Sequence, residues 1–167
     1  MNARIGIDFG GVIVRNLHED TGEDTSLNNF SGAEAARDGA FDAIRPLCSA
    51  CDGRVWIVSK AVPRMQERTM FWLQCVDFFS RTGLLPDHVR FCLQRENKAS
   101  ICRNLEISHF IDDRVHVMQI LRGVVPHLCL FGERGAERFC PPWATFATNW
   151  AEVLGWVSCS LQSKAQH

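Results

Sequence analysis

Several features that would settle a protein's class at once are missing from this chain. Its 167 residues carry 18 Lys plus Arg against 19 Asp plus Glu, so the formal net charge is only -1. A chain so balanced offers no broad basic face, and nucleic acid held by its backbone charge is not an expected partner. No apolar run approaches the roughly 20 residues of a membrane span, and the first residues do not resemble a secretion signal. We therefore expect a cytoplasmic protein without membrane contacts.

The chain also lacks a second Cys-x-x-Cys pair that would complete a zinc finger with Cys48 and Cys51. Most of its eight cysteines lie inside apolar runs, where a free thiol behaves as a small buried hydrophobe. The spacing of Cys48 and Cys51 also fits a redox or zinc pair, and that alternative stays open. A disulfide framework is disfavoured in a chain of this length without an export signal. We interpret the cysteines as reduced and structural.

What the chain does contain is a regular alternation of short apolar runs and helical patterns. Strands are expected within 4–14 and at 54–60, 88–93, 108–111 and 126–131. Helices are expected at 32–48, from Pro63 until Gly83, and at 97–105, 114–122 and 150–157. Such alternation predicts an α/β fold, a three-layer, doubly wound, mostly parallel sheet of about five strands.

One domain is expected over residues 1–160, because no repeat or low-complexity segment divides the chain. Residues 16–30 are polar and acidic and predict a loop over one end of the sheet, followed by a capping box of Ser31 and Glu34. Residues 141–160 predict a C-terminal packing segment, in which the aromatic run 143–146 packs or covers a sheet edge. Residues 161–167 are expected to be a frayed tail.

Polar side chains follow several of these apolar runs at the point where a strand should end. They are Asp8, Ser59, Asp112 and Asp113, with Lys98 at the start of a helix. Ligands of an open parallel sheet bind outside the carboxyl ends of its strands. Three carboxylates crowded there repel one another unless a cation lies among them, and oxygen ligands alone favour Mg²⁺. A hydroxyl, a lysine and the amides of Gly10 and Gly11 beside the ion would suit a phosphoryl group.

Plainer interpretations exist for each of these residues. Asp8 also fits the start of a glycine-rich turn, and Asp112 with Asp113 also fits a helix cap. Lys60 is a rival to Lys98 for the cationic role. The histidines share no ligand spacing and are interpreted as surface or satisfied core groups.

Together, Asp8-Phe9-Gly10-Gly11-Val12, Val58-Ser59, Lys98 and Phe110-Ile111-Asp112-Asp113 resemble the four ordered motifs of the haloacid dehalogenase-like (HAD-like) hydrolase superfamily. The resemblance covers roughly residues 4 to 131 and implies the Rossmann-like core of that superfamily. No gap between the motifs has room for a full cap domain, so the chain resembles a capless or minimal-cap member. An open site of this kind suits a phosphorylated small molecule or macromolecule, or a homo-oligomer that lends a cover.

The resemblance also implies a role for each motif residue. Asp8 matches the nucleophile that becomes an aspartyl-phosphate, and Lys98 the cation that neutralises the nucleophile and the phosphoryl oxygens. Asp8, the Gly10 carbonyl, Asp112 and Asp113 match the magnesium ligands. The phosphate-binding groups would be Ser59, Lys98, Gly10 and Gly11.

One position departs from the pattern of the family. Its phosphatases usually place a second Asp, the general acid, where this chain has Gly10. General acid catalysis contributes roughly 10²–10⁴-fold, so turnover of ordinary esters is expected to be slow. The acids at 19, 20, 23 and 24 of the polar loop are candidates to replace it. The leading hypothesis is a magnesium-dependent phosphohydrolase. The alternatives are a catalytically impaired metal- and phosphate-binding or regulatory protein and, less favoured, a dehalogenase or phosphonatase.

Overall fold

The computed structural model describes residues 3–15 and 36–163, and the polar segment 16–30 with its expected capping box lies outside that range. The strands are β1 (Ile5–Ile7), β2 (Val55–Lys60), β3 (Val89–Cys92), β4 (His109–Asp112), β5 (His127–Phe131) and β6 (Thr145–Ala147). The α-helices are α1 (Ala40–Ala50), α2 (Pro63–Cys75), α3 (Phe78–Thr82), α4 (Lys98–Asn104), α5 (Val115–Leu121) and α6 (Trp150–Ser163). Three short 3₁₀ turns are η3 (Pro86–His88), η4 (Arg95–Asn97) and η5 (Glu137–Phe139).

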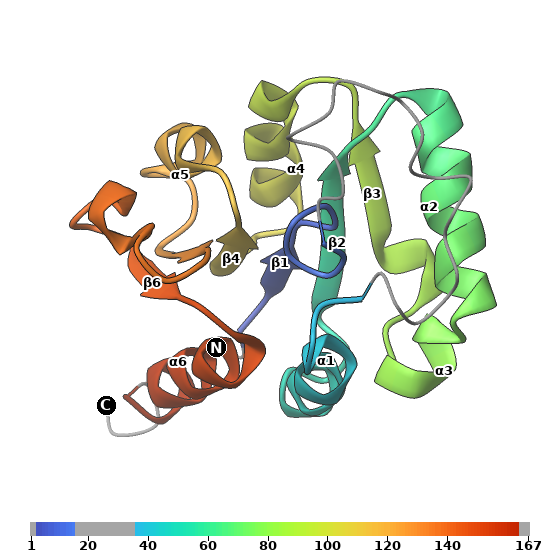
Figure 1. Ribbon diagram of the computed structural model, residues 1–167, viewed down its shortest axis with the longest axis horizontal. Coiled ribbons are helices and arrows are strands. Elements are labelled where there is room, and N and C mark those ends of the chain that lie inside the picture. Colours follow the sequence, from blue (N-terminus) through green and yellow to red (C-terminus); the bar gives the residue numbers. More distant parts are fainter. Residues whose placement is uncertain (1–2, 16–35, 164–167) are drawn as a thin grey trace.

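The strands form one six-stranded sheet in the order β3-β2-β1-β4-β5-β6, and every neighbouring pair is parallel. The chain starts in the middle, builds outward to β3, and then crosses back to build β4, β5 and β6 (Figure 1). This is the predicted doubly wound α/β fold, and its strand order switches between β1 and β4. Ligands of such sheets bind at that switch point, beyond the carboxyl ends of the two strands.

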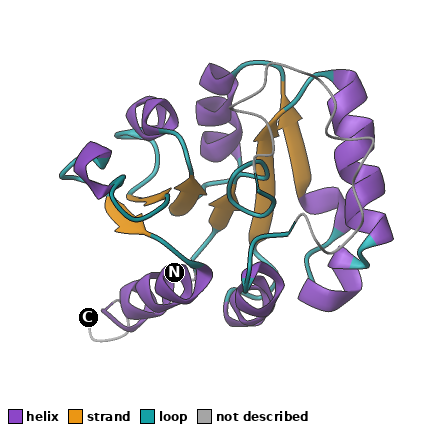
Figure 2. Cartoon of the chain, in the orientation of Figure 1, coloured by secondary structure: helices purple, strands orange, loops and turns teal. Residues whose placement is uncertain are grey.

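Helices cover both faces of the sheet and make three layers (Figure 2). One apolar cluster joins α1, α2, α3 and α6 to side chains such as Ile7 and Ile57. The other apolar cluster, on the opposite face of the sheet, joins α4 and α5 to the strand side chains of Trp56, Val58 and Phe110. Because successive strand side chains point to opposite faces, the nearly continuous apolar run of β2 fills both clusters. No helix in the described ranges is long and apolar enough to span a membrane.

Gly6 in β1 allows β1 and β4 to pack around a large aromatic side chain. A Cβ at this position would lie 2.4 Å from Cδ2 of Phe110, which is fully buried. Real Cβ contacts are never so short, so any larger residue would displace the ring. The glycine therefore places the two strands that will carry the site against each other.

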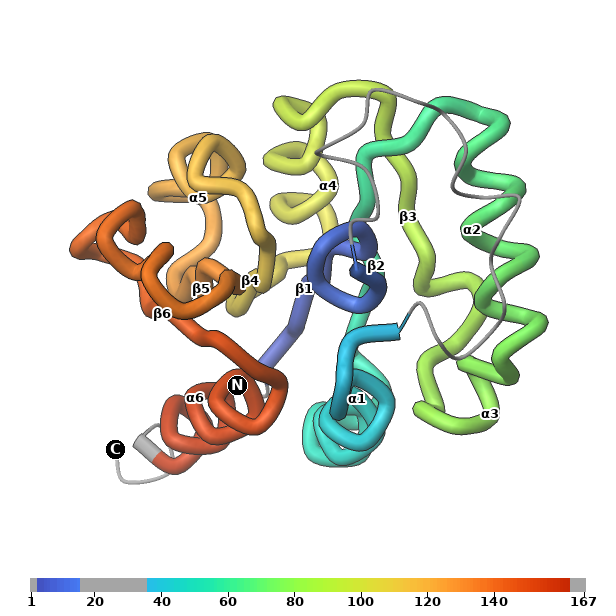
Figure 3. Tube along the Cα trace, viewed as in Figure 1, coloured from blue at the N-terminus to red at the C-terminus, as the bar shows by residue number. Residues whose placement is uncertain are grey.

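The structure differs from the sequence expectation at four elements. The short strand β6 was not predicted as a strand, although the aromatic run 143–146, which overlaps it, does cover the edge of β5. Helix α1 begins at Ala40 and not near residue 32, because Ala36 pairs with Val14 in an antiparallel bridge and Gly39 has a φ of 75°. The helix expected from Pro63 to Gly83 is broken at Asp77, whose φ is +55°. Helix α6 continues to Ser163 (Figure 3). Within this extension, Leu161 packs against the core.

Candidate active site

The first carboxylate of the site is placed by the end of β1. The amide of Asp8 donates a 2.9 Å hydrogen bond to the carbonyl of Ile111, so the pairing of β1 with β4 continues beyond the strand. Asp8 is 9% exposed. Since the two strands run in parallel and end together, Asp8 and Asp112 emerge side by side at the same edge of the sheet.

The turn after Asp8 is held from several directions. The amides of Ile13 and Val14 both donate to the carbonyl of Phe9, at 3.0 and 3.2 Å. Gly11 has a φ of 79°, which a side chain would disfavour, and its carbonyl accepts a 3.1 Å bond from Arg37 Nε. The indole Nε1 of Trp150 donates to the Val12 carbonyl at 3.0 Å. A residue from the far end of the chain thus fixes the backbone of the turn that follows Asp8.

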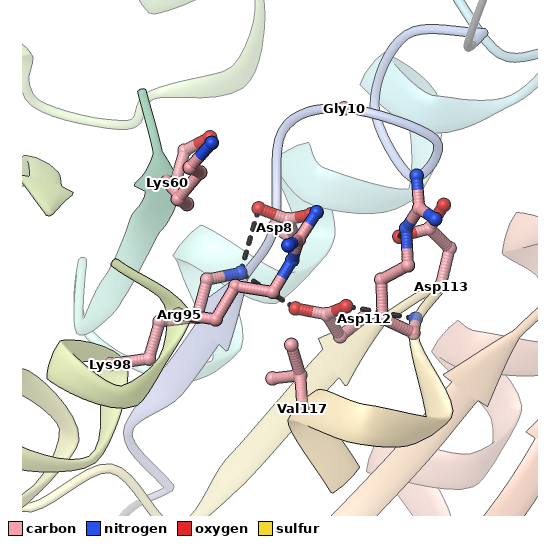
Figure 4. A pocket seen from close by; sticks show the side chains of 10 residues that line it. Asp8, Gly10, Lys60, Arg95, Lys98, Asp112, Asp113 and Val117 are labelled. Atoms are coloured by element: carbon pink, nitrogen blue, oxygen red, sulfur yellow. Dashed lines mark hydrogen bonds and ion pairs between the residues drawn. The ribbon is translucent and has the colours of Figure 1, made fainter. Parts of the chain in front are cut away.

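Lys98 lies between the two strand-end carboxylates. Its Nζ is 2.9 Å from Asp8 Oδ1 and 2.7 Å from Asp112 Oδ2, and its side chain is 2% exposed (Figure 4). The ammonium also lies 5.4 Å from the centre of the Phe110 ring. Of the two lysines that the sequence left as rivals, Lys98 contacts the carboxylates, while Lys60 is exposed at the end of β2.

The Asp112-Asp113 pair follows β4. Asp112 is fully buried, and its Oδ1 accepts a 2.9 Å bond from the amide of Arg114, which precedes α5. The helix-cap interpretation of this residue is wrong, because the N-cap of α5 is Arg114 and no side chain caps the helix; Asp112 Oδ1 bonds only the amide of that cap residue. The other oxygen contacts Lys98. Asp113 is less buried, and its Oδ1 lies 3.7 Å from Arg114 Nε.

Asp8, Asp112 and Asp113 each offer one oxygen to a common point, and these three oxygens lie within 4.8 Å of one another. Among the described residues, one buried cation, Lys98, contacts this group, and the more exposed Arg114 lies beside Asp113, so the three carboxylates exceed the positive charge in contact with them. A small divalent cation with oxygen ligands fits both the donor set and the missing charge. The backbone of Gly10 borders the same space.

Burial and the short distances between these charged groups shift their pKa values. Burial raises the pKa of Asp112, and the negative charge of Asp8 raises it further, against the opposing effect of Lys98. Burial and Asp8 likewise raise the pKa of Asp113 to about 6. Burial alone would lower the pKa of Lys98, but Asp8 and Asp112 more than offset it, so that pKa lies above its usual value and the ammonium stays charged.

A cavity of about 200 Å³ opens over these residues. Its lining residues are Asp8, Gly10, Ser59, Lys60, Arg95, Lys98, Asp112, Asp113, Arg114 and Val117. All the predicted site residues except Gly11 are among them. Gly11 lies behind the turn, where its carbonyl is used by Arg37. The acids at 19, 20, 23 and 24, expected to replace the general acid, lie outside the described residues.

Arg95 is a lining residue that the sequence analysis missed. It opens η4, the 3₁₀ turn directly before Lys98, and the amide of Lys98 donates to its carbonyl. A basic residue three positions before the motif lysine, at a helix start, is the pattern that would have indicated it. Side chains three apart in a 3₁₀ turn lie over one another, so Arg95 and Lys98 point to the same side.

The Cys48 and Cys51 pair is not part of this site. Both thiols are free and buried against the core of the α1 face. Burial raises the pKa of Cys48 to about 11 and also raises the pKa of Cys51, so neither is a ready thiolate for metal binding or redox exchange. This supports the structural interpretation of the pair.

The sequence matches no protein-family model, and no curated protein is similar to it. Solved structures are similar in fold. A D,D-heptose 1,7-bisphosphate phosphatase from B. bronchiseptica, complexed with magnesium and phosphate, is 14% identical, with a TM-score of 0.62 over 96% of this chain and 99% of that one. A haloacid dehalogenase-like hydrolase from Xanthomonas campestris is 9% identical, with a TM-score of 0.62 over 99% and 97% of the two chains. A HAD-superfamily hydrolase from Ehrlichia chaffeensis is 11% identical, with a TM-score of 0.60 over 96% and 97%. At these identities the comparisons establish the fold alone: the chain shares the α/β fold of these three structures.

Proposed function

We propose that this protein is a magnesium-dependent phosphohydrolase of the HAD-like superfamily, acting through an aspartyl-phosphate on Asp8. The observation that carries the proposal is the buried Asp8–Lys98–Asp112 cluster, with Asp113 beside it. This cluster lies between β1 and β4, where the strand order of the sheet switches. Three carboxylates and one lysine in this arrangement would hold Mg²⁺ through Asp8, Asp112, Asp113 and the Gly10 carbonyl. The bound ion would supply charge neutralisation at the phosphoryl oxygens. All eight cysteines are free, which supports a cytoplasmic location, where thiols stay reduced.

The chain's own residues would divide the work as follows. A carboxylate oxygen of Asp8 attacks phosphorus, the bond from phosphorus to the leaving oxygen breaks, and the leaving oxygen takes a proton from solvent. Lys98 holds Asp8 in place and neutralises charge on the transferring group, while Ser59 donates a hydrogen bond to it. Water then attacks the phosphorus of the aspartyl-phosphate, which releases inorganic phosphate and restores the Asp8 carboxylate.

Gly10 defines the expected substrates. No carboxyl group stands at position 10 to protonate a departing alkoxide. Loss of general acid catalysis lowers the rate by roughly 10²–10⁴-fold. Leaving groups that need no proton, such as aryloxides and carboxylates, should escape most of this penalty. Aryl and acyl phosphates should therefore be turned over faster than alkyl phosphates.

The test is Mg²⁺-dependent hydrolysis of para-nitrophenyl phosphate by the wild type and Asp8→Asn. We expect turnover that chelation abolishes and Mg²⁺ restores, and a loss of roughly 10⁴-fold or more in the variant. Asp87→Asn is the matched control, because Asp87 is exposed in η3 at the opposite end of β3. Borohydride reduction during turnover should convert Asp8 to homoserine, which peptide mass spectrometry locates.

Two outcomes would contradict the proposal. Equal activity in wild type and Asp8→Asn would remove Asp8 as the nucleophile. No turnover by a folded wild type that binds Mg²⁺ would favour the alternative of a metal- and phosphate-binding protein without catalysis. A Gly10→Asp variant sharpens the same question, since it should accelerate alkyl phosphates more than para-nitrophenyl phosphate.

A further inference from the structure

Two cations at the mouth of the cavity have no role in the chemistry proposed above. Lys60 and Arg95 both line the cavity, Lys60 exposed and Arg95 half-buried. Across the residues that the structure describes, neither forms an ion pair or a side-chain hydrogen bond. Arg114, the third cation of the rim, differs from them because its Nε lies 3.7 Å from Asp113.

The backbone places these two cations on a second level above the buried cluster. Arg95 precedes Lys98 by one 3₁₀ turn, so it lies over the lysine that contacts Asp8 and Asp112. Lys60 ends β2 directly after Ser59 and pairs with Cys92 of β3. Figure 4 shows Arg95 and Lys98 extending from the same segment toward Asp8, with Lys60 at the end of the neighbouring strand.

The charges of the buried cluster and of the two outer cations can be counted separately. Inside, the three carboxylates are balanced by Lys98 and a divalent ion. The transferring phosphoryl group is then served by Lys98, Ser59 and the ion, as proposed. Lys60 and Arg95 then have no assigned partner. Because Asp8 attacks phosphorus from the buried side, the leaving part of the substrate must extend toward the exposed side of the cavity, where these two cations lie. Of the lining residues that the structure describes, all but Gly10 and Val117 have a polar side chain, so the mouth favours a strongly polar group over an apolar one.

We infer that the substrate carries a second anionic group, a carboxylate or a further phosphate, on its leaving portion, and that Lys60 and Arg95 bind it. This inference rests on the proposed function, since it assigns the leaving side of the same site. Charge-assisted hydrogen bonds from a guanidinium and an ammonium are the strongest that side chains can offer to such a group. The pair acts on specificity, because it touches the part of the substrate that does not react.

The test compares aryl phosphates that differ at one distant position. Phenyl phosphates with a 4-carboxylate and with its neutral isostere, a 4-carboxamide, have good leaving groups but different charge. We expect the wild type to favour the carboxylate in kcat/KM by about tenfold or more. Lys60→Gln and Arg95→Gln should each remove most of that preference, chiefly through KM, with a clearly smaller loss on the carboxamide than on the carboxylate. 1,4-Phenylene bisphosphate tests whether a phosphate is preferred to a carboxylate.

Arg103→Gln is the control, because Arg103 is an exposed residue of α4 that does not line the cavity. Equal losses on the charged and the neutral substrate would overturn the inference, since they would assign the two cations to the transferring phosphoryl group. An unchanged preference in both variants would overturn it as well.

A binding measurement separates this inference from the proposed function. Calorimetric titration of the Asp8→Asn protein in Mg²⁺ with the same two phosphates requires no catalysis. Preferential binding of the carboxylate that is lost in the Asp8→Asn, Arg95→Gln double variant supports the second anionic site even if no turnover is ever found. Equal binding of the two phosphates by Asp8→Asn overturns the inference, whatever the turnover.

Discussion

The two ends of strand β4 bury two polar side chains in opposite ways. His109 begins the strand and Asp112 ends it, and neither side chain is exposed at all. The partners of His109 include two hydroxyls, Ser108 Oγ at 2.9 Å and Ser160 Oγ at 2.6 Å, and the ring of His127 stacked at 4.5 Å between centroids. Around Asp112 they are charged, namely Lys98 in contact and the carboxylates of Asp8 and Asp113 nearby.

The difference teaches which buried polar group indicates a function. A buried group whose hydrogen bonds are formed with neighbouring hydroxyls is already stabilised by the protein and requires no bound ligand. A cluster with more buried carboxylates than cations does not, because burial penalises each uncompensated charge. Such a cluster persists in a folded protein when a bound ion completes it, so the carboxyl end of β4 indicates a site and its amino end indicates a structural support.

Removing the central cation should have the largest effect. Lys98→Met keeps the volume of the side chain but leaves Asp8 and Asp112 facing each other without their ammonium. Breaking a buried ion pair by deleting one partner costs about 3 kcal/mol or more, so we expect a loss of that size in the free energy of unfolding at pH 7 without Mg²⁺. Urea denaturation measures it, and turnover of para-nitrophenyl phosphate should be lost as well.

Lys60→Met is the matched control for this substitution. Lys60 is exposed and should change the free energy of unfolding by less than about 0.5 kcal/mol. An equal effect of the two variants would mean that the Lys98 contacts add no stability, and the contrast between the two ends of β4 would fail.

Removing a carboxylate should have the opposite sign. The pKa of Asp113 is raised in the folded protein, from the usual value of 3.8 to about 6. Between these pH values the folded state binds more protons than the unfolded state, so the stability of the metal-free wild type falls as the pH rises from about 4 to about 6. Asp113→Asn should therefore stabilise the metal-free protein at pH 8 by roughly 1 to 2 kcal/mol, allowing for partial solvent screening.

Thermal or urea unfolding of both proteins at pH 4 and pH 8, in chelator, measures the effect. Mg²⁺ should stabilise the wild type more than the variant, because the variant has lost a ligand. A variant that is less stable than the wild type at pH 8 in chelator would show that Asp113 is not held in an unfavourable charged state.

The sequence predicted the fold and the site to different depths. Continuous apolar runs such as Val55–Val58, with helical patterns between them, were enough for a doubly wound parallel sheet. The predicted Asp8, Ser59, Lys98, Asp112 and Asp113 meet in one cavity because strand ends share an edge, which is a general property of parallel sheets. What each group does there remains a proposal.

The parts that escaped prediction depend on contacts between distant segments. The pairing of Val14 with Ala36 delays the start of α1, and no local pattern near Ala36 reports on Val14. β6 is only three residues long and owes its conformation to β5. Asp77 breaks the α2–α3 pattern in a left-handed conformation that Asp tolerates, although it gives no strong local indication of a break.

The smallest expected effect tests the amino end of β4. Ser160 Oγ donates to the Val157 carbonyl at 2.9 Å and contacts His109 Nε2 at 2.6 Å, so Ser160→Ala removes a partner from a fully buried ring. We expect a loss of about 1 kcal/mol in the free energy of unfolding. Ser158→Ala is the control, because Ser158 Oγ also bonds to a helix carbonyl, that of Leu154, but is not a hydrogen-bond partner of His109 in the described part of the chain. The same exchange in the same helix cancels helix propensity, and the difference between the variants isolates the histidine contact. Both should hydrolyse para-nitrophenyl phosphate at the wild-type rate under the proposed function, since a network of hydroxyls and imidazoles at the far end of the strand supports the sheet without tuning the carboxylates. A drop in turnover specific to Ser160→Ala would mean that the two ends of β4 are coupled, and the division between support and site would no longer hold.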